Sequence, residues 1–133
     1  MSPYLIYIGG PPMKAVLGHL GLMPMAKPLT SKEGHAVLAR DHYHCRYCGL
    51  DAESNFENSL IMTVDFVLPR VLKGKKSAEN LVAACRPCNV IKGHRKFASF
   101  EDAKAYILKR RAELRKEWEG DIAKLHTHAM SAP

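Results

Sequence analysis

The sequence predicts a small α+β domain built around a metal ion. Four cysteines form two Cys-x-x-Cys pairs, two short apolar segments lie between the pairs, and an amphipathic segment follows the second pair. The chain has 133 residues, which suffices for one domain with a modest core. Apolar residues make up 47% and charged residues 25%, so the composition is that of a globular protein.

Residues 1–30 are rich in proline, glycine and methionine and show no sustained period. We expect them to form a partly disordered N-terminal arm, with one short strand at residues 4–8. That apolar stretch lacks a basic flank and is interrupted by Gly9-Gly10-Pro11-Pro12, so we do not expect a secretory signal. No apolar run approaches the ~18 residues that a membrane span needs. We therefore expect a cytoplasmic protein with no membrane partner.

Residues 31–98 are expected to form the metal-binding domain. Thr30-Ser31-Lys32-Glu33 is typical of a helix start, with Thr30 or Ser31 as the cap and the helix running to about Arg40. Residues 50–59 are polar and indicate a loop. Leu60 to Leu68 and Asn80 to Ala84 predict two strands, separated by a basic loop. A short helix is expected from Asn89 to about Gly93.

Residues 99–125 are expected to form a C-terminal amphipathic helix packed on this domain. Ser99 and the acid three positions later resemble a capping box. Apolar residues then recur at helical spacing and predict a face turned toward the core: Phe100, Ala103, Ile107, Leu114, Trp118, Ile122 and Leu125. Lys109-Arg110-Arg111 would lie on the solvated face, and the tail after about Lys124 would be loose.

The cysteines predict a structural metal site. Cys45, Cys48, Cys85 and Cys88 leave no cysteine unpaired, and two Cys-x-x-Cys turns can place four thiolates around Zn²⁺. The pairs are 36 residues apart, more than the ~15–20 of a compact zinc ribbon, so a sizeable element lies between them. Disulfides, a redox pair and an iron site are the alternatives.

The positive charge is concentrated in one segment. Between Arg70 and Lys96 the chain has eight basic residues and one acid, Glu79, while the whole chain carries a net charge of +7. A basic cluster of this kind favours a polyanionic partner, with nucleic acid first. A solvated surface that keeps the protein soluble is the alternative interpretation.

In the order of these elements and in four motifs, the chain resembles the HNH endonuclease family. The motifs are C-R-Y-C at 45–48, T-V-D-F-V-L-P-R at 63–70, E-N-L-V-A-A-C-R-P-C-N at 79–89 and K-G-H-R at 92–95. The resemblance covers about Ser31 to Lys96. It implies a zinc-stapled ββα-metal fold, in which a hairpin packs on a helix and zinc is structural. A second ion, Mg²⁺ or Mn²⁺, would serve hydrolysis of DNA phosphodiesters.

The resemblance also implies roles for individual residues. Asp65 and Asn89 match the ligands of the catalytic ion, and Asn80 matches the asparagine that holds the loop and orients the base. Phe66 stands where the family has its general-base histidine, and phenylalanine can neither accept a proton nor bind a metal. Loss of a general base typically costs ~10²–10⁴-fold in rate. Activity is therefore expected to be weak or lost, unless His42, His44 or His94 supplies a base.

The expected partner is DNA, with RNA as a second possibility. Contacts to the phosphate backbone would come from six basic residues: Arg70, Lys73, Lys75, Lys76, Lys92 and Arg95. Double-strand cleavage would need two active sites, so a homodimer is compatible with the sequence. Two alternatives to an active nuclease are a catalytically silent zinc module that binds nucleic acid, and a protein-interaction domain that uses the C-terminal helix.

Overall fold

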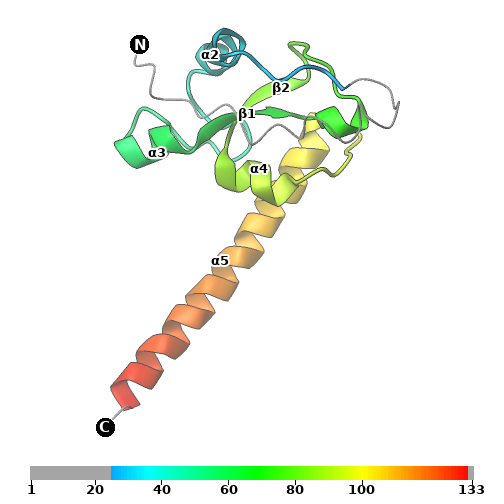
Figure 1. The fold of residues 1–133 in the computed structure, drawn as a ribbon. Coiled ribbons are helices and arrows are strands. Elements are labelled where there is room, and N and C mark those ends of the chain that lie inside the picture. The colour runs from blue at the N-terminus through cyan, green and yellow to red at the C-terminus, as the bar shows by residue number, and fades with distance from the viewer. Residues whose placement is uncertain (1–24, 132–133) are drawn as a thin grey trace.

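The computed structural model describes residues 25–131, and the expected strand at residues 4–8 lies outside them. The elements follow in the order α2 (Ser31–Arg40), α3 (Phe56–Leu60), β1 (Met62–Phe66), the 3-10 turn η1 (Arg70–Leu72), β2 (Leu81–Cys85), α4 (Arg86–Lys92) and α5 (Phe100–Ser131). Figure 1 shows a small body made of α2 to α4 and the hairpin, from which α5 projects. The predicted α+β class is confirmed.

Helix α2 begins and ends where the sequence predicted. Thr30 is the N-cap: its hydroxyl accepts from the Glu33 amide, and the Glu33 carboxylate accepts from the Thr30 amide. This reciprocal pair satisfies two amides that the first turn leaves without helical partners. Val37 and Leu38 are buried and attach the helix to the hairpin.

The two strands form an antiparallel hairpin whose register is fixed by burial. Met62 pairs with Cys85, Asp65 with Val82 and Phe66 with Leu81. All five residues of β2 are buried, whereas in β1 only Met62 and Asp65 are. β2 therefore lies at the centre of the body, in contact with both α2 and α4.

Two expectations about local structure were wrong. Residues 50–59 are not only a loop, because Asn55 caps the short helix α3, with its side chain accepting from the Asn58 amide. The helix after the second cysteine pair begins at Arg86 rather than Asn89, since Pro87 fits the first turn, where no amide partner is needed. The first difference arises from a capping side chain, and the second arises from the tolerance of proline in a first helical turn.

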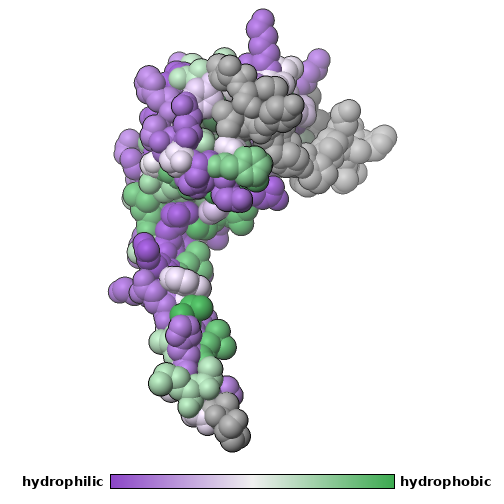
Figure 2. All heavy atoms as spheres, turned by 90° about the vertical axis from the view of Figure 1, so that its left-hand side faces the viewer, coloured by the Kyte–Doolittle hydropathy of each residue, from purple (hydrophilic) through white to green (hydrophobic). Residues whose placement is uncertain are grey.

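Helix α5 differs most from the expectation. It extends to Ser131, so the segment after Lys124 is helical. Only Ala103 and Ile107 are buried, and Trp118 and Leu125 are 59% and 63% exposed. The expectation that the apolar face packs on the domain therefore holds only for the first turns (Figure 2). Within residues 25–131, no helix combines the length and apolar character that a membrane crossing requires.

Asp41 connects α2 to the sheet from the end of the helix. Its buried carboxylate accepts two hydrogen bonds from Arg40 at 3.0 Å and one from the Ala83 amide at 2.8 Å, and Arg46 lies 3.4 Å away. Burial opposes ionisation of this carboxyl group, but the hydrogen bonds from Arg40 and Ala83 outweigh burial and lower its pKa.

We predict that Asp41→Ala destabilises the protein by about 2–3 kcal/mol, because a buried amide and two guanidinium groups lose their acceptor. Urea denaturation of the metal-loaded protein at neutral pH measures this loss. Glu119→Ala, which removes an exposed ion pair with Arg115 on α5, is the control and should change stability by less than ~0.5 kcal/mol. Equal effects of the two changes would contradict the assigned role of Asp41.

Candidate functional site

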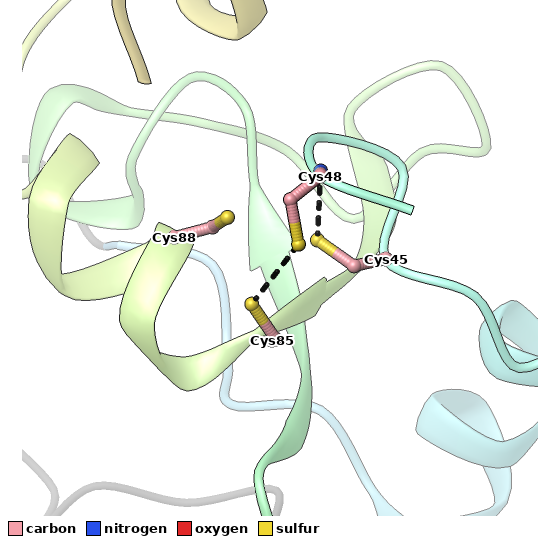
Figure 3. Close-up of side chains that lie close together, drawn as sticks. All are labelled: Cys45, Cys48, Cys85 and Cys88. Carbon is pink, nitrogen blue, oxygen red and sulfur yellow. Dashed lines mark hydrogen bonds between the residues drawn. The ribbon is translucent and has the colours of Figure 1, made fainter. Parts of the chain in front are cut away.

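The four cysteines converge at the base of the hairpin. Cys45 and Cys48 lie on the loop between α2 and α3, and Cys85 and Cys88 lie at the junction of β2 and α4 (Figure 3). Their four sulfur atoms all lie within 4.8 Å of one another, and none forms a disulfide. This is the one cluster with metal-ligand geometry among residues 25–131.

The spacing of the sulfurs fits a tetrahedral metal ion. With metal–sulfur bonds of about 2.3 Å, the edges of a thiolate tetrahedron measure about 3.8 Å. The Cys48 and Cys85 sulfurs are 3.6 Å apart, and these two residues belong to different pairs. The two predicted knuckles therefore form a single four-thiolate site, as the sequence indicated.

The loop that carries the first pair depends on left-handed backbone conformations. Gly49 has a φ of 79°, and its amide donates to the Cys45 carbonyl at 2.8 Å. The Cys48 amide points at the Cys45 sulfur at 3.4 Å, and the Arg46 amide donates to the Ala83 carbonyl of β2. These bonds turn both thiolates of the loop toward the second pair.

One residue beside this site was not expected from the sequence. Arg111, expected on the solvated face of α5, places its guanidinium 3.6 Å from the Cys88 sulfur. A hydrogen bond from a guanidinium to a metal-bound thiolate is a typical outer contact that holds a ligand in place. The signal in the sequence was its position one helical turn after Ile107, on the same side of the helix.

We predict that removal of the metal unfolds the body, since the four ligands come from two distant segments and the core is small. Thermal melts followed by circular dichroism, before and after treatment with a chelator, measure the effect. Cys85→Ser should reproduce it. An unchanged cooperative melt in a sample shown to be metal-free would contradict the structural role.

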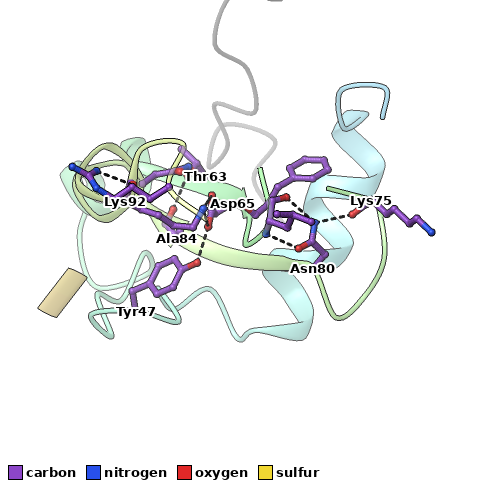
Figure 4. Close-up of polar contacts among 11 residues, drawn as sticks. Tyr47, Thr63, Asp65, Lys75, Asn80, Ala84 and Lys92 are labelled. Carbon is purple, nitrogen blue, oxygen red and sulfur yellow. Dashed lines mark hydrogen bonds and ion pairs between the residues drawn. The ribbon is translucent and has the colours of Figure 1, made fainter. Parts of the chain in front are cut away.

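The predicted catalytic residue Asp65 is buried inside the body. It is 5% exposed, and the Tyr47 hydroxyl donates to its Oδ2 at 2.6 Å (Figure 4). Lys92 Nζ lies 3.3 Å from each of its carboxylate oxygens and 3.0 Å from the Phe66 carbonyl. The partner that a carboxylate in this apolar strand requires is thus the ammonium group of Lys92.

Lys92 is therefore not available to a phosphate in this structure, and its assignment to the nucleic-acid contacts needs correction. The side chain is fully buried, because α4 directs it at the hairpin and not at solvent. Burial raises the pKa of Asp65 even though Lys92 and Tyr47 favour its charged form. The ionised carboxylate consequently depends on the neighbouring ammonium group.

Asn89 faces the same side of β1 as Asp65, but no described contact joins the two side chains. Its side-chain amide donates to the Thr63 hydroxyl at 3.1 Å, and that hydroxyl donates to the Ala84 carbonyl at 2.8 Å. Because alternate residues of a strand share one face, Thr63 and Asp65 are neighbours there. Both Asp65 oxygens are engaged by Tyr47 and Lys92, so a divalent ion could reach this carboxylate only by displacing those contacts.

Phe66 points to the opposite face of β1. It packs against the apolar cluster of Leu29, Val37 and Leu81, and the Arg70 guanidinium lies 5.9 Å from its ring centroid. The ring is thus part of a hydrophobic contact between α2 and the hairpin. His42, His44 and His94, the candidate substitute bases, are all exposed, and no described contact joins them to Asp65.

Asn80 holds the loop between the strands. Its side-chain oxygen accepts from the Leu68 amide at 2.7 Å, and its amide donates to the Leu68 and Lys75 carbonyls at 3.1 and 3.0 Å (Figure 4). Gly74 closes the same loop so tightly that an added Cβ would lie 1.7 Å from the Leu68 oxygen. The loop that carries Lys73 and Lys75 therefore has a fixed path.

The basic residues predicted to contact phosphate differ in their availability. Lys73 and Lys75 are exposed on this loop. Lys76 pairs with Glu33 at 3.0 Å; hydrogen bonds from Thr30 and Lys76 lower the pKa of Glu33 to about 2. Arg70 donates to the Ala26 carbonyl, and Arg95 donates to carbonyls of α4 while its guanidinium lies 5.0 Å from the Tyr106 ring centroid.

We predict that Lys92→Met destabilises the protein by about 3 kcal/mol, because it leaves a buried carboxylate without its counter-charge. The double change Asp65→Asn with Lys92→Met should recover most of this loss. Chemical denaturation of the metal-loaded variants measures both. Equal losses in the single and double variants would contradict the ion pair.

Comparison with known proteins identifies one family. Residues 45–95 match the model of the HNH endonuclease family. This segment runs from the first cysteine of the metal site to Arg95 and includes the hairpin and α4. The chain matches no curated protein and no solved structure.

Proposed function

We propose, from the match of residues 45–95 to the model of the HNH endonuclease family, that this chain binds nucleic acid through its phosphate backbone and hydrolyses it weakly at most. The family acts on nucleic acid, which makes this class of partner the first choice. The observation that carries the proposal is the state of β1, where Phe66 lies in an apolar cluster and Asp65 is paired with Lys92.

Binding would use the loop between β1 and β2. Lys73 and Lys75 are exposed there, and the hydrogen bonds of Asn80 fix the backbone that carries them. Contacts from lysine to phosphate position a protein on DNA but do not read sequence. We therefore propose DNA as the partner, with affinity that depends strongly on salt and weakly on sequence.

We propose Zn²⁺ as the ion of the four-thiolate site. Four thiolates in a tetrahedron are the usual ligand set of structural zinc. Iron bound in the same way would colour the protein, so a colourless sample with zinc equimolar to the chain is the expected result of elemental analysis.

A second candidate function is metal-dependent hydrolysis of DNA. It is favoured by the family match and by the placement of Asp65 and Asn89 toward one face of β1. A divalent ion would have to displace the Lys92 ammonium group from Asp65 before these residues could bind it. The two candidates therefore make opposite predictions for a plasmid assay.

We predict that Lys73→Glu with Lys75→Glu weakens binding to a short DNA duplex at least tenfold and lowers the slope of log affinity against log salt by roughly 2. Fluorescence anisotropy over a range of salt concentrations measures both quantities. The control, Lys109→Glu with Lys116→Glu, makes the same charge change at exposed positions on α5. If both double variants lose affinity equally, net charge rather than this loop determines binding.

We predict that the protein leaves supercoiled plasmid intact in Mg²⁺ and in Mn²⁺, at the level of an Asp65→Asn control. Asn is preferred to Ala here because it fills the same volume beside Tyr47 and Lys92. Phe66→His alone should remain inactive as long as Lys92 occupies Asp65. Metal-dependent nicking that disappears in Asp65→Asn would establish the second candidate function instead.

A further inference from the structure

Helix α5 carries an apolar face that the body covers only in the first turns of the helix. The face begins with the buried Ala103 and Ile107 and continues as the stripe Leu114, Trp118, Ile122 and Leu125. At about 100° per residue, these four positions fall within an arc of about 80° centred near Ile107. Leu114, Trp118 and Leu125 are 36%, 59% and 63% exposed. Apolar residues are visible along the projecting helix in Figure 2.

A helix in this situation requires a partner. Most helical stability in proteins comes from packing of an apolar face against other groups. An exposed apolar stripe with polar flanks is typical of an interaction site. We propose that a second copy of this chain covers the stripe, with the two α5 helices antiparallel and related by a two-fold axis near residue 120.

The order of the apolar residues fits this arrangement. In an antiparallel pair, a residue faces the residue that lies equally far on the other side of the axis. Leu114 and the partner's Leu125 are nearly equidistant from residue 120, as are Trp118 and the partner's Ile122. The two pairs place the two-fold axis at positions that differ by less than one residue. The stripe can therefore pair with itself along its length, as a two-fold interface demands.

The charges beside the stripe favour the antiparallel direction. Six residues with ionisable side chains lie on one flank of the helix: Arg110, Glu113, Glu117, Asp121, Lys124 and His128. In an antiparallel pair this flank faces its own copy, so Glu117 would lie near the partner's Lys124 and Glu113 near the partner's His128. In a parallel pair this flank would face the opposite flank of the partner helix, and these charge pairs would not form.

On that flank, the carboxylates of Glu113 and Glu117 share a single cationic partner. Arg110 lies 3.2 Å from Glu113 and 3.4 Å from Glu117, so one guanidinium serves two carboxylates. Lys124 and His128 form no ion pair within residues 25–131 and are exposed. A second cation from a partner helix would balance the pair of acids. The proposal does not depend on the nuclease or nucleic-acid assignment.

The first test is the oligomeric state of the full, metal-loaded chain. Sedimentation equilibrium should show a reversible dimer below roughly 100 µM, and Trp118→Ser should weaken it at least tenfold. The matched control is Met130→Ser, which removes an apolar residue that is 89% exposed but lies about 140° round the helix from Ile107. A monomer at every concentration up to that limit, or equal effects of the two changes, would overturn the proposal.

The second test fixes the direction of the helices. Glu117→Lys and Lys124→Glu should each weaken the dimer about fivefold, and the double variant should return to within about twofold of the original. Circular dichroism checks that each variant keeps its helix. If the double variant is as weak as the single ones, the antiparallel register is wrong. A dimer unaffected by Trp118→Ser would place the interface elsewhere and overturn the proposal.

Discussion

The convergence of four thiolates on one point is the constraint on which the rest of the body depends. Cys45 and Cys48 come from a loop after α2, and Cys85 and Cys88 come from the junction of β2 and α4. The site therefore joins segments that local interactions would not hold together. It also fixes α5, whose Arg111 contacts Cys88 and whose Phe100 stacks on Tyr47 at 5.2 Å. A core this small needs such a cross-link.

Tyr47 connects the metal centre to the interior polar contacts. It lies between two metal ligands in the sequence, stacks on Phe100 and donates to Asp65. Asp65 in turn accepts from Lys92 of α4, so one carboxylate links the loop, the hairpin and the helix. These contacts use the Asp65 carboxylate to stabilise the fold, and a hydrolytic site would need the same carboxylate to bind a metal ion. A gain in structural stability here opposes metal-dependent chemistry.

The two ends of α5 meet different requirements. Near the body, Ala103 and Ile107 are buried and Arg111 contacts the thiolate cluster. Farther along, the same helical period continues without a partner among the described residues of this chain, and Lys124 follows Glu113 and Glu117 on the same flank. The same apolar spacing thus packs on the core in the first turns of α5 and, in our proposal, on a second copy of the chain in the remaining turns.

The sequence by itself determined most of the elements, although not α3 or the end of α5, because capping residues, alternation and helical period are local properties. Thr30 as a cap, the hairpin on either side of the basic loop, and the four-cysteine site all follow from residues close in sequence or from simple ligand arithmetic. Only the tertiary structure decided what each charged or apolar group contacts. It placed Lys92 against Asp65, Arg111 against Cys88 and Trp118 in solvent. Periodicity indicates which residues share a face, but the atoms opposite that face depend on how distant segments pack.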